Sequence, residues 1–168
     1  DQKLRIRRAE LMVAGQIAPA SLAGQSGPKY FFKFDPARRI TPPGAKPLPG
    51  NAVIQDFGLS YAIPAGIEFT AGQFKIPTTA EGLISSAELP LPERSLVGRT
   101  YGDRREVGLK LGYKQARWTA LAMASSGRSI SVVGRGAIHD LHSRLEYMPL
   151  KTLGFGGFLT LTDLDYSK

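Results

Sequence analysis

The sequence predicts an all-β fold, a transmembrane antiparallel β-barrel that contributes about eight strands from 168 residues. Apolar and polar side chains alternate along most of the chain, as they do in half-wet strands. The predicted strands run to about ten residues, close to the ~9–11 that a tilted strand needs to cross a bilayer. Aromatic residues lie near strand ends, where an interfacial girdle would place them. These are Tyr61, Tyr113, Trp118 and Tyr147.

The first half of the chain alternates with a period of two. In the segment RIRRAELMVAGQI, Leu11 and Val13 share a side opposite Arg8 and Met12. The stretch 36–50 is rich in proline and glycine and predicts a loop. A tight IPAG connection joins the last two strands of this half into a β-hairpin. The strands are predicted over 5–17, 29–35, 51–61 and 67–75.

The second half of the chain resumes the alternating pattern after a long connecting segment over residues 76–98, which we call the excursion. In RREVGLKLGYK, apolar residues such as Leu109 face one way, while Arg104 and Lys110 face the other. A return strand begins near the single tryptophan, and a weaker stretch over 126–136 is loop-like at its ends. Two further strands close the chain. Strands are predicted here over 104–114, 116–125, 140–150 and 153–164.

The composition is that of a folded, basic chain. Lys and Arg outnumber Asp and Glu by 22 to 14, which gives a net charge of +8 and favours either an anionic partner or simply a soluble basic surface. Cysteine is absent, so disulfides and thiolate metal sites are excluded. No apolar run approaches the ~20 residues of a membrane-spanning helix. Helical membrane proteins are therefore excluded.

Two architectures fit this alternation, a soluble sandwich or small barrel with its apolar face inward, and a membrane barrel with its apolar face toward lipid. The polar faces are rich in Gly, Thr, Arg, Lys and Glu, as in a water-filled lumen. Together with strand length and the aromatic positions, this favours the membrane barrel. The pattern by itself leaves the soluble alternative open.

Several motifs, in order, resemble the N-terminal half of the phosphate- and polyphosphate-selective outer-membrane porins of Gram-negative bacteria. They are RIRRAELMVAG, IQDFGLSYAIPAGIEFTAGQFKIP, LPLPERSL, RREVGLKLGYK, and SRLEYMPL followed by LGFGGFLTL. The similarity runs from Arg5 to about Leu161, and the order of the motifs is more specific than any one of them. The chain departs from the family pattern at Thr78, at ASSG and at Glu106.

The resemblance implies a barrel of about sixteen strands, assembled as a homotrimer in the outer membrane of a Gram-negative bacterium, with loops folded into the lumen. Residues 1–168 would form a single β-barrel domain that supplies about half of such a wall, so we expect the chain to be incomplete. The implied partners are small phosphate-like anions, outer-membrane lipid and lipopolysaccharide. Neither a nucleic acid nor a cofactor is expected.

The excursion over residues 76–98 is predicted to fold into the barrel and narrow the pore. Its apolar residues and three prolines would be unfavourable in a long water-exposed loop. Leu83, Ile84, Leu89 and Leu91 are the apolar residues concerned. Arg94 would either line the water path, or pair with Glu93 or with the barrel wall and hold the loop in place. Both interpretations put Arg94 in the lumen.

Cationic side chains in a confined pore favour anions, because their charges are less screened there than at an open surface. Arginine binds phosphate through its planar fork, and lysine acts as a mobile point charge. For each candidate the alternative is a solvated charge paired with a neighbour, as Arg144 would be with Glu146. The candidate pore-lining, anion-binding residues are Arg8, Lys75, Arg94, Arg104, Lys110 and Arg144.

Catalysis and metal binding are not predicted. No nucleophile motif, phosphate loop or zinc spacing occurs, and His139 and His142 should point to opposite faces of a strand. Two other functions compete with the anion-preferring channel. One is a non-conducting structural barrel that acts as a scaffold in an envelope assembly. The other is a soluble basic barrel that binds nucleic acid, which needs aromatics interleaved with Lys and Arg, a pattern seen only in KYFFKFD.

Overall fold

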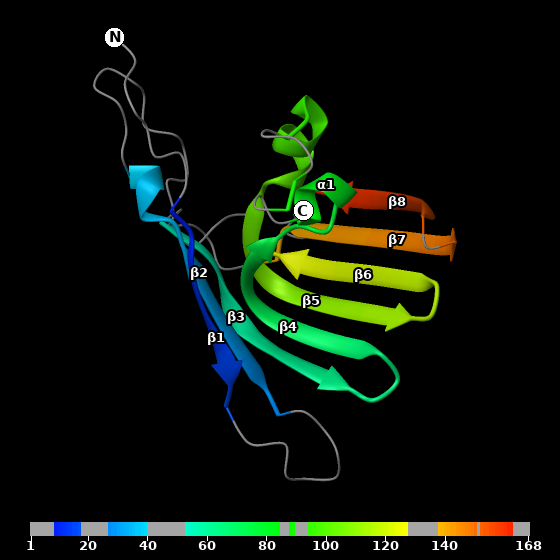
Figure 1. The fold of residues 1–168 in the computed structure, drawn as a ribbon, viewed down its shortest axis with the longest axis horizontal. Coiled ribbons are helices and arrows are strands. Elements are labelled where there is room, and N and C mark those ends of the chain that lie inside the picture. The colour runs from blue at the N-terminus through cyan, green and yellow to red at the C-terminus, as the bar shows by residue number, and fades with distance from the viewer. Residues whose placement is uncertain are drawn as a thin grey trace, which may run out of the picture.

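The computed structural model describes residues 9–17, 27–39, 53–84, 88–89, 94–127, 138–150 and 152–162. Its strands form one antiparallel sheet of eight, in which each strand pairs with the next along the chain (Figure 1). The prediction of an all-β fold with about eight strands is confirmed. The strands are β1 (Leu11–Gln16), β2 (Lys29–Phe34), β3 (Ile54–Ile63), β4 (Ile67–Lys75), β5 (Arg105–Gln115), β6 (Trp118–Ser125), β7 (Asp140–Leu150) and β8 (Leu153–Leu161).

In the part of the chain that the structure describes, three short helical turns lie between the strands. Pro36–Arg39 form a 3-10 turn, η1, inside the stretch predicted as a loop, and residues 40–52 lie outside the described part of the chain. The connection from β4 to β5, residues 76–104, includes the segment 76–98 described above, and from here on we call the whole connection the excursion. It contains α1 (Ala80–Leu83) and a π-helical turn, η2 (Gly98–Gly102). Among the described residues, no helix has the length and apolarity needed to cross a membrane.

The turns of the three long hairpins lie along the same edge of the sheet, meaning the edge formed by the ends of the strands. Ile63 pairs with Ile67, Gln115 with Trp118, and Leu150 with Leu153. In the first of these turns Ala65 and Gly66 both have positive φ, 81° and 78°. Long connections leave from the opposite edge, including the excursion from β4 to β5. Strands β1 and β8 lie at the two ends of the strand order, so the sheet formed by the described residues is open.

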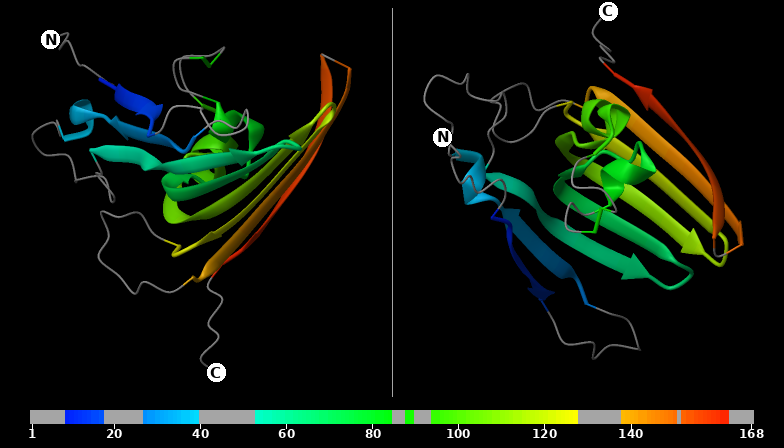
Figure 2. Two further views of the ribbon diagram at one scale, coloured as in Figure 1. Left: turned by 90° about the horizontal axis from the view of Figure 1, so that it is seen from below. Right: turned by 45° about the horizontal axis from the view of Figure 1, so that its top comes forward.

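The sheet is strongly curved (Figure 2), and the side chains on its two faces differ in polarity. The excursion lies on the concave side, where a small apolar cluster of Phe74, Ile76 and Met123 is buried. Leucines of the opposite strand parity remain exposed on the convex side. Leu109, Leu145 and Leu159 are 61%, 52% and 59% exposed. The apolar side chains predicted to point outward therefore do so.

The aromatic residues predicted near strand ends form a band along the edge where the hairpins turn. Tyr61 pairs across strands with Phe69, and Trp118 with Tyr147. The rings of Trp118 and Tyr147 lie 4.4 Å apart between centroids. Tyr113 is in the same band, opposite Ile67. This arrangement is typical of an interfacial girdle.

A row of glycines makes room on the concave face. Gly58 pairs with Gly72, and Gly72 with Gly108. Gly72 has φ of +143°, and a Cβ atom there would overlap the carbonyl oxygen of Phe57, so only glycine fits. After Gly72, the side chains of β4 no longer alternate regularly between the two faces of the sheet. Gln73 has the strand parity of the convex apolar residues, yet it is fully buried and donates to the carbonyl of Gln55 at 2.7 Å.

Candidate functional site

The excursion crosses the concave face from β4 toward β7. Arg144, on β7, donates from its guanidinium to the carbonyl oxygen of Thr78. The hydroxyl of Thr78 donates in turn to the carbonyl of Tyr101 at 2.6 Å, which joins the two limbs of the excursion. The excursion is therefore attached to β4 and β5, which it connects, and also to β7.

Within the excursion α1 and η2 pack against each other. A Cβ atom on Gly82 would overlap the carbonyl oxygen of Gly102, so the two turns approach at backbone contact. The Glu81 carboxylate accepts hydrogen bonds from the hydroxyl of Ser95 and from its backbone N–H, the latter at 2.7 Å. These two bonds lower the pKa of Glu81. The described parts of the excursion thus pack together through two short helical turns.

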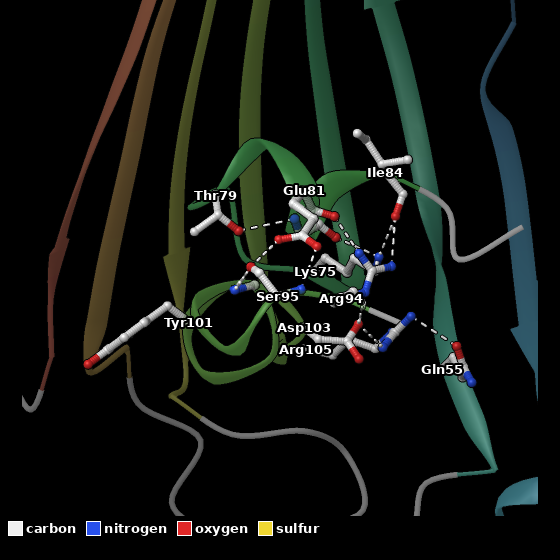
Figure 3. A network of polar contacts seen from close by, with 12 residues as sticks. Gln55, Lys75, Thr79, Glu81, Ile84, Arg94, Ser95, Tyr101, Asp103 and Arg105 are labelled. Carbon is white, nitrogen blue, oxygen red and sulfur yellow. Dashed lines mark hydrogen bonds and ion pairs between the residues drawn. The ribbon is translucent and has the colours of Figure 1, made fainter. Parts of the chain in front are cut away.

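Two cationic side chains bind the carbonyls at the end of α1 (Figure 3). Lys75 Nζ donates to the carbonyl of Gly82 at 2.6 Å and to that of Ile84 at 3.1 Å. Arg94 donates to the carbonyl of Glu81 and, at 2.8 Å, to that of Ile84. The last carbonyls of a helix have no partner within it and favour positive charge. Lys75 and Arg94 therefore anchor α1.

A third cation joins these two around one carboxylate. Asp103 Oδ1 lies 3.8 Å from Lys75 Nζ, 3.9 Å from Arg94 Nε and 3.6 Å from Arg105 Nη1. Arg105 also pairs with Asp56 at 2.8 Å. Lys75, Arg94 and Arg105, which we call the cationic cluster, thus converge on the one carboxylate of Asp103. Asp103 is 32% exposed, so the cluster has contact with water.

Arg104 and Lys110 extend the positive charge along β5. Arg104, whose side chain is 49% exposed, lies 2.8 Å from Glu106 and 4.0 Å from Asp140. Lys110 Nζ lies 4.5 Å from the centroid of the Phe74 ring, at cation–π distance. No carboxylate of the described residues is within ion-pairing distance of Lys110. Among the described residues its ammonium group is therefore held by the Phe74 ring and not by an ion pair.

The remaining two candidates differ in what can be said of them. Arg144 is buried beneath the excursion and lies 3.5 Å from Glu146, the neighbour named in the paired-charge alternative. Its Nε has no hydrogen-bond partner among the described residues. Arg8 lies outside the described residues, as does Glu93, the neighbour expected to pair with Arg94.

A comparison with profiles of known protein families shows which family the chain belongs to. The profile of the phosphate-selective porins O and P matches residues 1–161. The chain belongs to this family. No curated protein and no solved structure gives a significant match. At the level of the family, the chain is an outer-membrane porin of Gram-negative bacteria.

Sequence reasoning missed two members of the porin's polar network. Arg105 shares the strand parity of Val107 and so was not assigned to the lumen, and Asp103 lies before the strand begins. Their part in the network can be recognised only in the folded structure, where Arg105 contacts Asp56 and Gln55 of β3. The only local hint of this network was the run of charged residues Asp103, Arg104 and Arg105. Because three consecutive charged residues do not alternate with apolar ones, this run by itself does not show which face each side chain occupies.

Proposed function

We propose that the chain forms part of the wall of a water-filled diffusion channel that prefers anions of the phosphate type. The cationic cluster carries this proposal, because three cations converge on the concave face around one partly water-exposed carboxylate. In a confined pore such charge attracts anions more strongly than at an open surface. Membership of the phosphate-selective porins O and P supports the same ligand class.

The six candidate residues divide into two roles in this proposal. Lys110 and Arg104, whose side chains reach the concave face with few anchoring bonds, act on the passing anion. Lys75, Arg94 and Arg144 donate to backbone carbonyls of the excursion, so they also hold it in place. Arg8 stays a candidate for the first role from its strand parity alone.

The wider assembly is also part of the proposal. The sheet supplies about half of a barrel of about sixteen strands, residues 76–98 narrow the lumen, and the barrels associate as homotrimers in contact with lipopolysaccharide. A wall of eight strands closed on itself would be filled by its own side chains and would conduct poorly. The open sheet and the bulky excursion on its concave side both favour the wider barrel.

The channel function is tested by incorporating the porin into planar bilayers and measuring the reversal potential in a KCl gradient. We expect a chloride-to-potassium permeability ratio well above one, and a chloride current that added phosphate reduces. A stable insertion without conductance would instead support the scaffold function. A cation-preferring channel would contradict the proposal outright.

The single tryptophan offers a separate test of how the porin sits in its membrane. Trp118 is exposed on the convex side of the aromatic band, so we expect it at the lipid interface. Lipids brominated near the headgroup should quench its fluorescence more strongly than lipids brominated near the chain end, and aqueous iodide should quench it weakly. Strong quenching by iodide alone would show that the convex face is not in contact with lipid.

A further inference from the structure

A second polar cluster lies on the concave face, formed by residues of β5 and β7. Its members are Glu106, Asp140 and His142, all buried. One ligand atom from each, a carboxylate oxygen or an imidazole nitrogen, lies within 4.8 Å of the other two. His142 Nε2 is 3.0 Å from Glu106 Oε2. We propose that these three side chains form a binding site for a divalent transition-metal ion of the zinc class.

The donor set fits such an ion. Zinc takes imidazole nitrogen and carboxylate oxygen at about 2.0–2.2 Å, and a site with three protein ligands leaves a position for water. Imidazole selects against calcium and magnesium, which prefer all-oxygen sites. Two carboxylates and a neutral imidazole also match the double charge of the ion. A buried charge is most stable when it is paired or coordinates a metal.

The strand geometry explains how the ligands meet. Asp140 and His142 are two residues apart on β7, so they project from the same face. Glu106 comes from β5 and reaches them past Ser125 on the intervening β6, which pairs with Asp140. All three ligands therefore lie on paired strands, which hold a site more rigidly than loops do.

Neighbouring groups orient the ligands as outer-shell partners of a metal site would. The Ser125 hydroxyl donates to Glu106 Oε2 at 2.6 Å. Thr160 Oγ1 lies 3.3 Å from His142 Nδ1, which leaves Nε2 directed at the carboxylates. Metal-binding histidines usually engage their second ring nitrogen in this way. Gly127, with φ of +68°, leaves space next to Asp140, because a Cβ atom there would lie 3.1 Å from Oδ2.

Arg104 supplies the route for entry. It lies on Glu106 at 2.8 Å, and its side chain is half exposed to water. Swinging this guanidinium outward uncovers the Glu106 carboxylate, and a small separation of Glu106 from His142 lets the ion replace their hydrogen bond. Binding would thus release Arg104 from its ion pair.

The site pairs His142 with carboxylates rather than with the other histidine. His139 and His142 are three residues apart and were not expected to share a metal, and the cluster does not include His139. The carboxylates that complete the site lie 36 residues upstream and two residues upstream of His142. The longer of these separations has no recognisable motif in the sequence.

The test is a calorimetric Zn²⁺ titration of the full-length porin in detergent micelles. We expect one ion per chain with micromolar affinity, weakened at least about tenfold by Glu106→Gln and by His142→Ala. His139→Ala replaces the only other histidine and is the matched control, expected to bind as the wild type does. Heat-modifiable electrophoretic mobility reports whether each variant is folded.

A measurement on the wild-type protein keeps the proposal testable if a variant fails to fold. The X-ray absorption spectrum of the bound Zn²⁺ should show nitrogen and oxygen ligands with a single imidazole. No binding at millimolar Zn²⁺, two imidazoles in the spectrum, or loss of binding in His139→Ala would each overturn the proposal.

Discussion

Replacing Lys110 by glutamate should abolish or reverse the anion preference of the channel. Lys110 has no carboxylate partner within the described part of the chain, and its ammonium group faces the concave side above Phe74. A unit charge 4 Å from an ion contributes about 1–4 kcal/mol between the dielectric of water and that near a protein surface. Reversing the charge should therefore lower the chloride-to-potassium permeability ratio more than about tenfold, since about 1.4 kcal/mol corresponds to a factor of ten. The reversal potential in a KCl gradient measures the ratio.

Lys114→Glu is the matched control for Lys110→Glu. Lys114 lies on the same strand and the same face, four residues nearer the hairpin turn, and it is exposed. The change in net charge is identical, but the site is away from the excursion, so the shift in permeability ratio should be much smaller. Equal shifts in the two variants would mean that overall charge, rather than the position of Lys110, controls selectivity.

Replacing Arg94 by alanine should release the excursion and give larger, noisier single-channel currents. Arg94 is buried, and it donates to the carbonyls of Glu81 and Ile84 beside Asp103. Hydrogen bonds of a charged donor contribute about 1.5–3 kcal/mol each. Their removal takes this donor from the Glu81 carbonyl and leaves the Ile84 carbonyl with Lys75. Because the excursion occupies the concave side, its detachment should widen the water path. Single-channel recording in planar bilayers measures both amplitude and noise.

Arg94→Lys separates anchoring from charge. It keeps the positive charge but lacks the planar fork that reaches two carbonyls at once. If Arg94 acts mainly as an anchor, the lysine variant should also show noisy currents while its permeability ratio stays near that of the wild type. A quiet alanine variant with unchanged amplitude and a reduced permeability ratio would show that Arg94 acts on the anion and not on the excursion.

Strand β5 shows why so much of this fold could be predicted. In a pleated strand neighbouring side chains must point to opposite faces, so Leu109 and Lys110 are assigned by position alone. The hairpin around Gly66 was equally local, because its turn conformation depends on adjacent residues. Local steric rules of this kind need no knowledge of what lies across the sheet.

The prediction lost accuracy where the backbone leaves regular geometry. Gly72 has a φ that strands rarely adopt, and after it Gln73 is buried against β3 instead of following the alternation. Arg105 was missed for the same reason, since its partners belong to β3 and the excursion. A glycine in a strand can mark such a bend, but it does not say which residues will meet.

Local patterns along the chain specify the antiparallel sheet of about eight strands, its apolar and polar faces and the aromatic band at the hairpin turns, because alternation and turn chemistry act between neighbouring residues. The convergence of Lys75, Arg94 and Arg105 on Asp103, and the contact of Glu106 with His142 across an intervening strand, arise only in the folded chain. Those contacts depend on sheet curvature and on the path of the excursion. Both arise from the packing of many distant residues at once, which no local pattern encodes.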